Sequence, residues 1–199
     1  MKTLVNPVVG IHAAVFSRIE AIGDRWLLGL LARGAFASVL LFYYWSSAAT
    51  KIGPGLTGFL SIADGAYYQI LPPVIESAGY DTANVALFPW KIIVVLGTYA
   101  EFVLPLLVVL GLFTRIAALG MIGFVAVQSF VDVVFHGIGA EATGAVFDRF
   151  PDAVIADQRL LWVFPLLYLV FKGAGRVSLD ALLGRRTAPA LPARATAAA

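Results

Sequence analysis

Four long apolar runs constrain this chain more than any other feature of its sequence. They cover Trp26–Ala49, Trp90–Leu112, Ile116–Phe135 and Leu160–Phe171. The last run reaches full length only with its flanks, Asp157 on one side and Lys172 or Arg176 on the other. About 20 apolar residues in helical form cross the hydrocarbon core of a bilayer, where lipid offers the backbone no hydrogen-bond partner. The runs therefore predict an all-α, polytopic membrane protein with a four-helix transmembrane bundle.

The composition supports this class. Hydrophobic residues make up 60% of the 199 residues and charged residues only 13%, roughly half the charged share of a soluble domain. The chain has no cysteine, which excludes disulfides, thiolate metal sites and dithiol chemistry on its own side chains. A formal net charge of +2 provides no large basic face, so a nucleic-acid partner is not expected.

The placement of basic residues predicts the orientation. With both termini in the cytoplasm, the inner segments carry Lys2, Arg18, Arg25, Arg115, Lys172, Arg176, Arg185, Arg186 and Arg194. The outer segments then carry only Lys51, Lys91, Arg149 and Arg159. Cytoplasmic segments of membrane proteins are enriched in lysine and arginine, so this bias favours cytoplasmic termini.

Three regions follow from this topology. They are a cytoplasmic N-terminal segment at 1–25, a transmembrane domain at 26–175 and a cytoplasmic tail at 176–199. Residues 8–20 predict an amphipathic helix on the inner membrane surface. The long first outer loop, 51–89, predicts one or two short helices over the outer mouth of the bundle. The low-complexity tail is expected to be disordered from about residue 187.

Arg33 and Glu101 are ionisable residues deep inside the first and second predicted spans. A rise of about 1.5 Å per residue places Glu101 near mid-bilayer and Arg33 about 10 Å from the inner surface. An unpaired buried carboxylate is costly, so a partly buried Arg33–Glu101 ion pair is expected. Such a pair either performs chemistry or only fixes the helix register. Lys51 and Arg115 end apolar runs, and their side chains are expected to extend toward the membrane surface.

The third span adds a polar stripe. Gln128, Asp132 and His136 are four residues apart and share one helical face. This face either lines a pocket, relays protons or binds a metal, or it is a solvated helix end. The second histidine, His12, is expected at the opposite surface, so a multi-histidine metal site is excluded and no metal is predicted.

Aromatic residues near the span ends offer a second candidate surface. Tyr44 and Trp162, with neighbouring tyrosines, either line a slot for a quinone head group or form an interfacial aromatic belt.

Three segments resemble the DoxX family of small four-helix inner-membrane proteins. They are RGAFASVLLFYYWSSAATKI, AEFVLPLLVVLGLFTRIAALG and GAGRVSLDALL. The residues that carry the resemblance are Arg33, Lys51, Glu101, Arg115 and Asp180. The resemblance implies a bacterial or archaeal inner-membrane location. It also implies a link to redox biology, through thiosulfate:quinone oxidoreductase, oxidative-stress complexes or gene clusters for metal-responsive modified peptides.

Three functions follow as hypotheses. The first, which we prefer, is an accessory subunit that anchors redox, stress-response or peptide-maturation partners. The second is a quinone-linked oxidoreductase subunit of the thiosulfate:quinone type, in which Glu101 carries protons and Arg33 stabilises the reduced anion. The third is a small-solute or metal-ion permeation protein that uses Gln128, Asp132 and His136. A quinone is the one cofactor these hypotheses include.

Overall fold

The computed structural model describes residues 2–55 and 57–187, which form helices and turns without a β-strand. Within these residues, four helical segments are long and apolar enough to cross a membrane. They are Leu28–Ala49, Leu87–Leu110, Thr114–Phe135 and Val154–Lys172. The predicted all-α, four-span class is therefore confirmed. The predicted disorder of the tail concerns residues beyond Thr187, which lie outside the described part of the chain.

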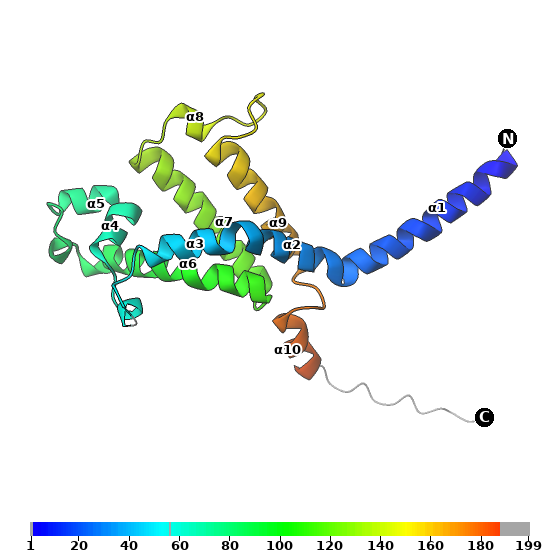
Figure 1. The fold of residues 1–199 in the computed structure, drawn as a ribbon, viewed down its shortest axis with the longest axis horizontal. Helices are drawn as coiled ribbons and strands as arrows, with labels where there is room; N and C mark the ends of the chain where they lie inside the picture. The colour runs from blue at the N-terminus through cyan, green and yellow to red at the C-terminus, as the bar shows by residue number, and fades with distance from the viewer. Residues whose placement is uncertain (1, 56, 188–199) are drawn as a thin grey trace.

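The first span continues an N-terminal helix. Helix α1 (Lys2–Ile22) runs through a π-helical turn into α2 (Leu28–Phe36), and a second π-helical turn leads to α3 (Phe42–Ala49). Figure 1 shows α1 projecting away from the bundle. Ile11, Val15 and Ile19 are exposed on it at a spacing of four, which places them on one face. The helix expected over residues 8–20 lies within α1, and its place on the inner membrane surface stays a prediction.

The remaining spans complete a closed bundle. They are built on α6 (Ile92–Leu110), α7 (Thr114–Phe130) and α9 (Leu160–Lys172). Each is extended at one end by a π-helical turn, at Leu87–Lys91, Val131–Phe135 and Val154–Arg159 respectively. Helix α7 packs on α9, α9 on α2, α3 on α6 and α6 on α7. The core between them includes Phe36, Leu40, Val108, Met121 and Leu166, all buried.

Short helices cover one end of the bundle, which we name the loop end (Figure 1). They are α4 (Asp64–Ile70), α5 (Pro72–Ser77) and α8 (Ala140–Thr143), with 3₁₀ turns at Gly58–Leu60 and Thr82–Asn84. Residues 62–86, named the cap, have a small core of their own in which Ala66, Tyr67 and Ile75 are buried. This core includes Val94 of α6, so the cap is fixed on the first turn of that helix.

The opposite end, named the terminal end, is held by Asp180. This residue lies in α10 (Leu179–Thr187), a helix in the segment that the sequence assigned to the tail. Its carboxylate accepts hydrogen bonds from the Phe113 and Thr114 backbone amides, at 2.7 and 2.9 Å, and from the Thr114 hydroxyl at 2.6 Å. The first amides of a helix have no partner within the helix. Asp180 therefore caps α7 from a distant part of the chain.

Arg33 binds backbone carbonyl groups at the end of α6. Its Nε and Nη2 atoms donate to the Val109 carbonyl at 3.1 and 2.7 Å. Its Nη1 atom donates to the carbonyls of Ala174 and Val177. The last carbonyls of a helix lack helical partners, and a guanidinium group can serve several of them at once. Arg33 thus joins the first span, the end of α6 and the segment after α9.

The Asp180 cap gives a stability prediction. An Asp180→Ala variant loses three hydrogen bonds to the α6–α7 turn, and we expect its free energy of unfolding to fall by about 1–2 kcal/mol. Asp180→Asn keeps a carbonyl acceptor and should lose less. Denaturant unfolding of the purified protein in detergent measures both changes. An Asp180→Ala variant as stable as the wild type would contradict the capping role.

Candidate functional site

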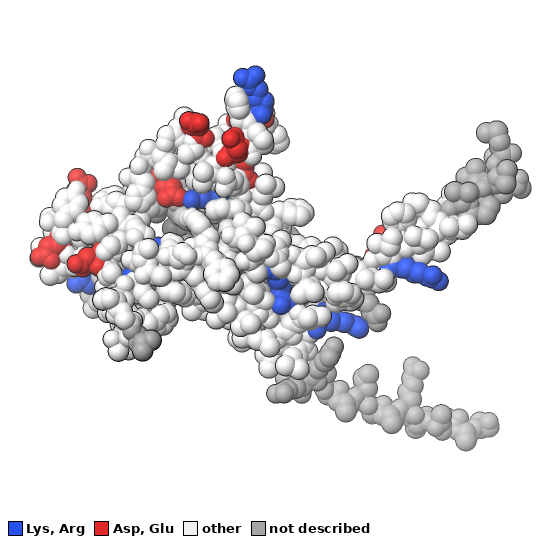
Figure 2. Space-filling model, in the orientation of Figure 1, with Lys and Arg blue, Asp and Glu red and all other residues white. Residues whose placement is uncertain are grey.

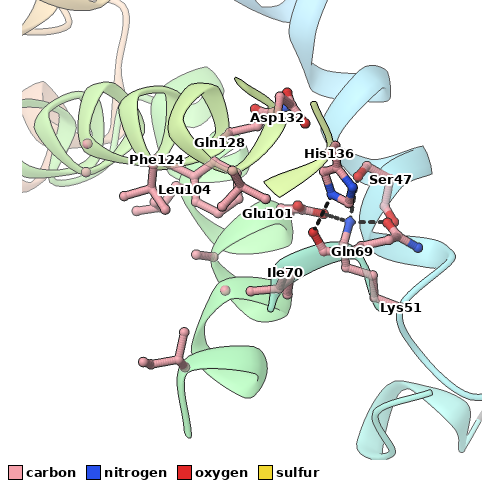
Figure 3. A pocket seen from close by; sticks show the side chains of 17 residues that line it. Ser47, Lys51, Gln69, Ile70, Glu101, Leu104, Phe124, Gln128, Asp132 and His136 are labelled. Carbon is pink, nitrogen blue, oxygen red and sulfur yellow. Dashed lines mark hydrogen bonds and ion pairs between the residues drawn. The ribbon is translucent and has the colours of Figure 1, made fainter. Parts of the chain in front are cut away.

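A cavity of about 480 Å³ lies beside α6 and α7 toward the loop end. Its apolar wall includes Ile70, Leu104, Phe124 and Val127. One group of polar side chains lies where the end of α3 and the cap meet α6, and others lie along the third span (Figure 3). Val127 is 63% exposed on the outer surface of the bundle, so the cavity borders the face that lipid would contact. We name it the α6–α7 pocket.

Small residues keep this pocket open. Gly97 and Ala100 line it from α6, and Gly120 and Gly123 line it from α7. A Cβ atom placed on Gly123 would meet no other atom within 4 Å. Gly123 is an exposed residue of the pocket lining, so a larger side chain can be placed there without a clash.

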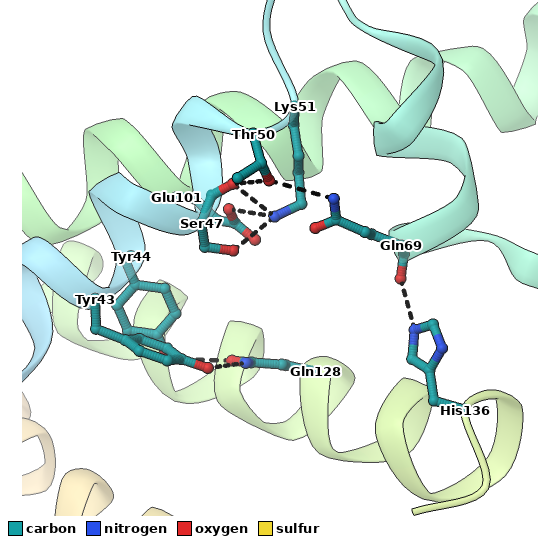
Figure 4. Close-up of polar contacts among 9 residues, drawn as sticks. All are labelled: Tyr43, Tyr44, Ser47, Thr50, Lys51, Gln69, Glu101, Gln128 and His136. Atoms are coloured by element: carbon teal, nitrogen blue, oxygen red, sulfur yellow. Dashed lines mark hydrogen bonds and ion pairs between the residues drawn. The ribbon is translucent and has the colours of Figure 1, made fainter.

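A buried ion pair forms the polar end of the pocket. The Lys51 Nζ atom lies 2.8 Å from Glu101 Oε2, and the two side chains are only 3% and 8% exposed. The same ammonium group donates to the Ser47 hydroxyl at 2.7 Å and to the Ser47 carbonyl at 3.2 Å (Figure 4). A buried charge is tolerated when it is paired and hydrogen-bonded, and here both conditions are met.

The predicted pairing of Glu101 with Arg33 is wrong. Arg33 binds backbone carbonyls at the terminal end, while Lys51 occupies the place beside Glu101. Depth along the membrane normal gives the distance of a residue from the surface, but not the helix that its side chain faces. Lys51 lies just past the end of α3, and its side chain turns back to Ser47 and Glu101.

The prediction that the Lys51 side chain extends toward the membrane surface is also wrong, because this side chain points to Glu101. The Lys51 carbonyl accepts a hydrogen bond from the Ala63 amide at 2.9 Å. The Gln69 side chain of α4 donates to the Thr50 hydroxyl at 3.2 Å. The cap thus folds back over the end of α3, and Lys51 is directed inward to Glu101.

The polar stripe of the third span lies along the pocket. Gln128, Asp132 and His136 all line it. The Gln128 amide donates to the Tyr43 hydroxyl at 2.8 Å and accepts from the Tyr44 hydroxyl at 3.3 Å. His136 Nε2 lies 3.1 Å from the Gln69 carbonyl (Figure 4), which links the end of the third span to the cap.

Asp132 has a partner that the sequence analysis missed. Arg159, at the start of the fourth span, forms an ion pair with its carboxylate and donates to the Ser129 hydroxyl at 2.9 Å. Arg159 is counted above among the outer cations, although the fourth span reaches full length only if it extends to Asp157. That extension already places Arg159 within the helix, as the structure has it.

The two predicted aromatic residues have different positions. Tyr44 is buried and reaches the pocket through its hydrogen bond to Gln128. Trp162 does not line the pocket, and its ring packs on Tyr43 with a centroid separation of 5.5 Å. Arg115 and Asp180 lie at the terminal end, where both line a second pocket.

Comparison of the chain with known protein families, curated proteins and solved structures gives no match.

The Lys51–Glu101 pair gives a prediction in the form of a double-mutant cycle. Glu101→Gln leaves a buried ammonium without its counter-charge, and Lys51→Met leaves a buried carboxylate alone. Each variant should lose about 3 kcal/mol of stability, because loss of one partner strands the other charge. The double variant Lys51→Met/Glu101→Gln removes both charges and should recover most of that loss. Thermal unfolding in detergent measures all four proteins, and additive losses would rule out the coupling.

Proposed function

We propose that this chain is an inner-membrane subunit of a redox or stress-response system, and that it holds a quinone or quinol head group in the α6–α7 pocket. The observation that carries the proposal is the buried Lys51–Glu101 pair at the end of an apolar cavity that borders lipid. We also propose, from the three sequence segments, that the chain is a DoxX-like protein of the bacterial inner membrane.

The pocket fits such a ligand in size and chemistry. Its volume of about 480 Å³ lies in the range of small-molecule sites, which are mostly apolar with a few placed polar groups. A quinone head group needs hydrogen-bond donors at its oxygens, and an isoprenoid tail needs an apolar exit. The three N–H groups of Lys51 all have acceptors, so a head-group oxygen would replace Ser47 as one of them. Val127 lies on the lipid-facing side of the cavity.

Glu101 has the position of a proton acceptor for this ligand. Its carboxylate lines the pocket while its Oε2 atom is held by Lys51. A bound quinone would supply two-electron, two-proton redox chemistry, and the chain would hold the ligand and exchange its proton at the Glu101 carboxylate. Arg33 has no part in this proposal, because it binds carbonyls at the terminal end.

The electrons would come from partner proteins, since the sequence offers no cysteine for a redox centre. In this proposal the chain is still an accessory subunit, and its contribution is to bind the quinone. Permeation of an ion has less support, because the Asp132 carboxylate is already paired with Arg159.

The orientation is also a proposal. Figure 2 shows acidic side chains gathered over the loop end, around α4, α5 and α8. They belong to a set that includes Asp64, Glu76, Asp81, Glu141, Asp148 and Asp152. The positive-inside rule then favours cytoplasmic termini, with the loop end on the outer side.

A pocket-filling variant tests quinone binding. Gly123→Leu should fill the cavity, and Gly34→Leu is its matched control. Gly34 is an exposed helical glycine outside the pocket, and a Cβ atom there also meets nothing within 4 Å. A ligand at a hundredfold excess over its dissociation constant stabilises a protein by about 2.7 kcal/mol. We expect decylubiquinone to raise the unfolding temperature of the wild type and of Gly34→Leu, but not of Gly123→Leu.

Two outcomes would count against the proposal. Equal shifts in Gly123→Leu and Gly34→Leu would show that the quinone binds elsewhere or only partitions into the micelle. Turnover of a quinone substrate by the purified chain alone would contradict the accessory role.

A further inference from the structure

A second pocket combines positive charge with an apolar wall. It has a volume of about 490 Å³ and lies at the terminal end, between the α6–α7 turn and the segment from α9 to α10. Arg115 and Ile116 line it from α7, and Gly173 lines it from the segment after α9. We name it the terminal-end pocket, and it shares no lining residue with the α6–α7 pocket.

One arginine lines this pocket and a second is next to a lining residue in the sequence. Arg115 and Arg176 are both exposed, and Arg176 directly follows Gly175 of the pocket wall. Among the residues that the structure describes, neither arginine has a carboxylate partner. The acidic group of the pocket is Asp180, whose two oxygens already accept hydrogen bonds from Phe113 and Thr114. The arginines are therefore available to an anion from outside the chain.

The pocket lies at the membrane boundary. Arg115 is the second residue of the third span, and Lys172 is the last residue of the fourth. Ile116 and Phe171, next to them, are 73% and 74% exposed and apolar. Charged and apolar surfaces thus meet at the level where lipid phosphates lie above their acyl chains. A free anion would use only the charged part of this arrangement.

We propose that the terminal-end pocket binds the head group of an anionic phospholipid. Arg115 and Arg176 contact the phosphate, and an acyl chain lies along Ile116 and Phe171. Basic pockets between transmembrane helices bind anionic head groups in this manner. A lipid held here touches α7 and the segment before α10, so it reinforces the Asp180 cap that joins them.

The first test needs no variant. Full-length protein in a neutral detergent is titrated with phosphatidylglycerol, with phosphatidylcholine and with inorganic phosphate, and the unfolding temperature is followed. We expect phosphatidylglycerol to raise it more than phosphatidylcholine does, with no effect of phosphate at the same concentration. Equal effects of the two lipids would overturn the proposal. A full effect of phosphate alone would assign the pocket to a free anion and overturn the lipid part.

The second test locates the site. Removal of one cation weakens attraction to an anionic membrane surface by about fivefold, so Arg115→Gln/Arg176→Gln should lower the apparent affinity for phosphatidylglycerol by roughly tenfold or more. Arg149→Gln is the control, since Arg149 is an exposed cation between α8 and the fourth span, outside the pocket and at the other end of the bundle. An unchanged affinity in the double variant, or an equal loss in Arg149→Gln, would contradict the assignment.

Discussion

Lys51 and Glu101 place two opposite charges, 2.8 Å apart, inside an otherwise apolar bundle. This pair determines much of the architecture around it. Each charge is tolerated only because the other is present, so the end of α3 must lie against the middle of α6. The cap then covers the turn after α3 and keeps Lys51 away from solvent. The same arrangement leaves a polar group at the end of the α6–α7 pocket, where an amphipathic ligand can use it.

Charged residues have different partners at the two ends of the bundle. At the terminal end, Arg33 binds carbonyls at the end of α6, and Asp180 binds amides at the start of α7. Both satisfy backbone groups that a helix leaves without partners, and their task is structural. At the loop end, Glu101 and Asp132 are paired with cations and also line a cavity. The proposed quinone site therefore lies toward the loop end, while the proposed lipid site lies at the terminal end, where Arg33 and Asp180 join the helices.

The four spans could be predicted from sequence because bilayer thickness sets the length of an apolar helix. The shared face of Gln128, Asp132 and His136 followed from the helical period. The partners of the charged residues could not be predicted in this way. Glu101 pairs with a lysine just past the end of α3, whose side chain turns back to Ser47, and Asp180 caps a helix that begins 66 residues earlier. Such contacts depend on the crossing angles of the helices and on the paths of the loops. The hydropathy of the sequence contains no information on either.

The double-neutral variant Lys51→Met/Glu101→Gln tests the central claim most directly. It keeps the approximate shape of the pocket and removes both charges, so the fold and the ligand site can be separated. The measurement is the shift in unfolding temperature on addition of decylubiquinone, with the wild type beside it. We predict a folded protein whose quinone-induced shift is lost. A full shift in this variant would show that the buried pair is not part of a quinone site and serves only to hold the bundle.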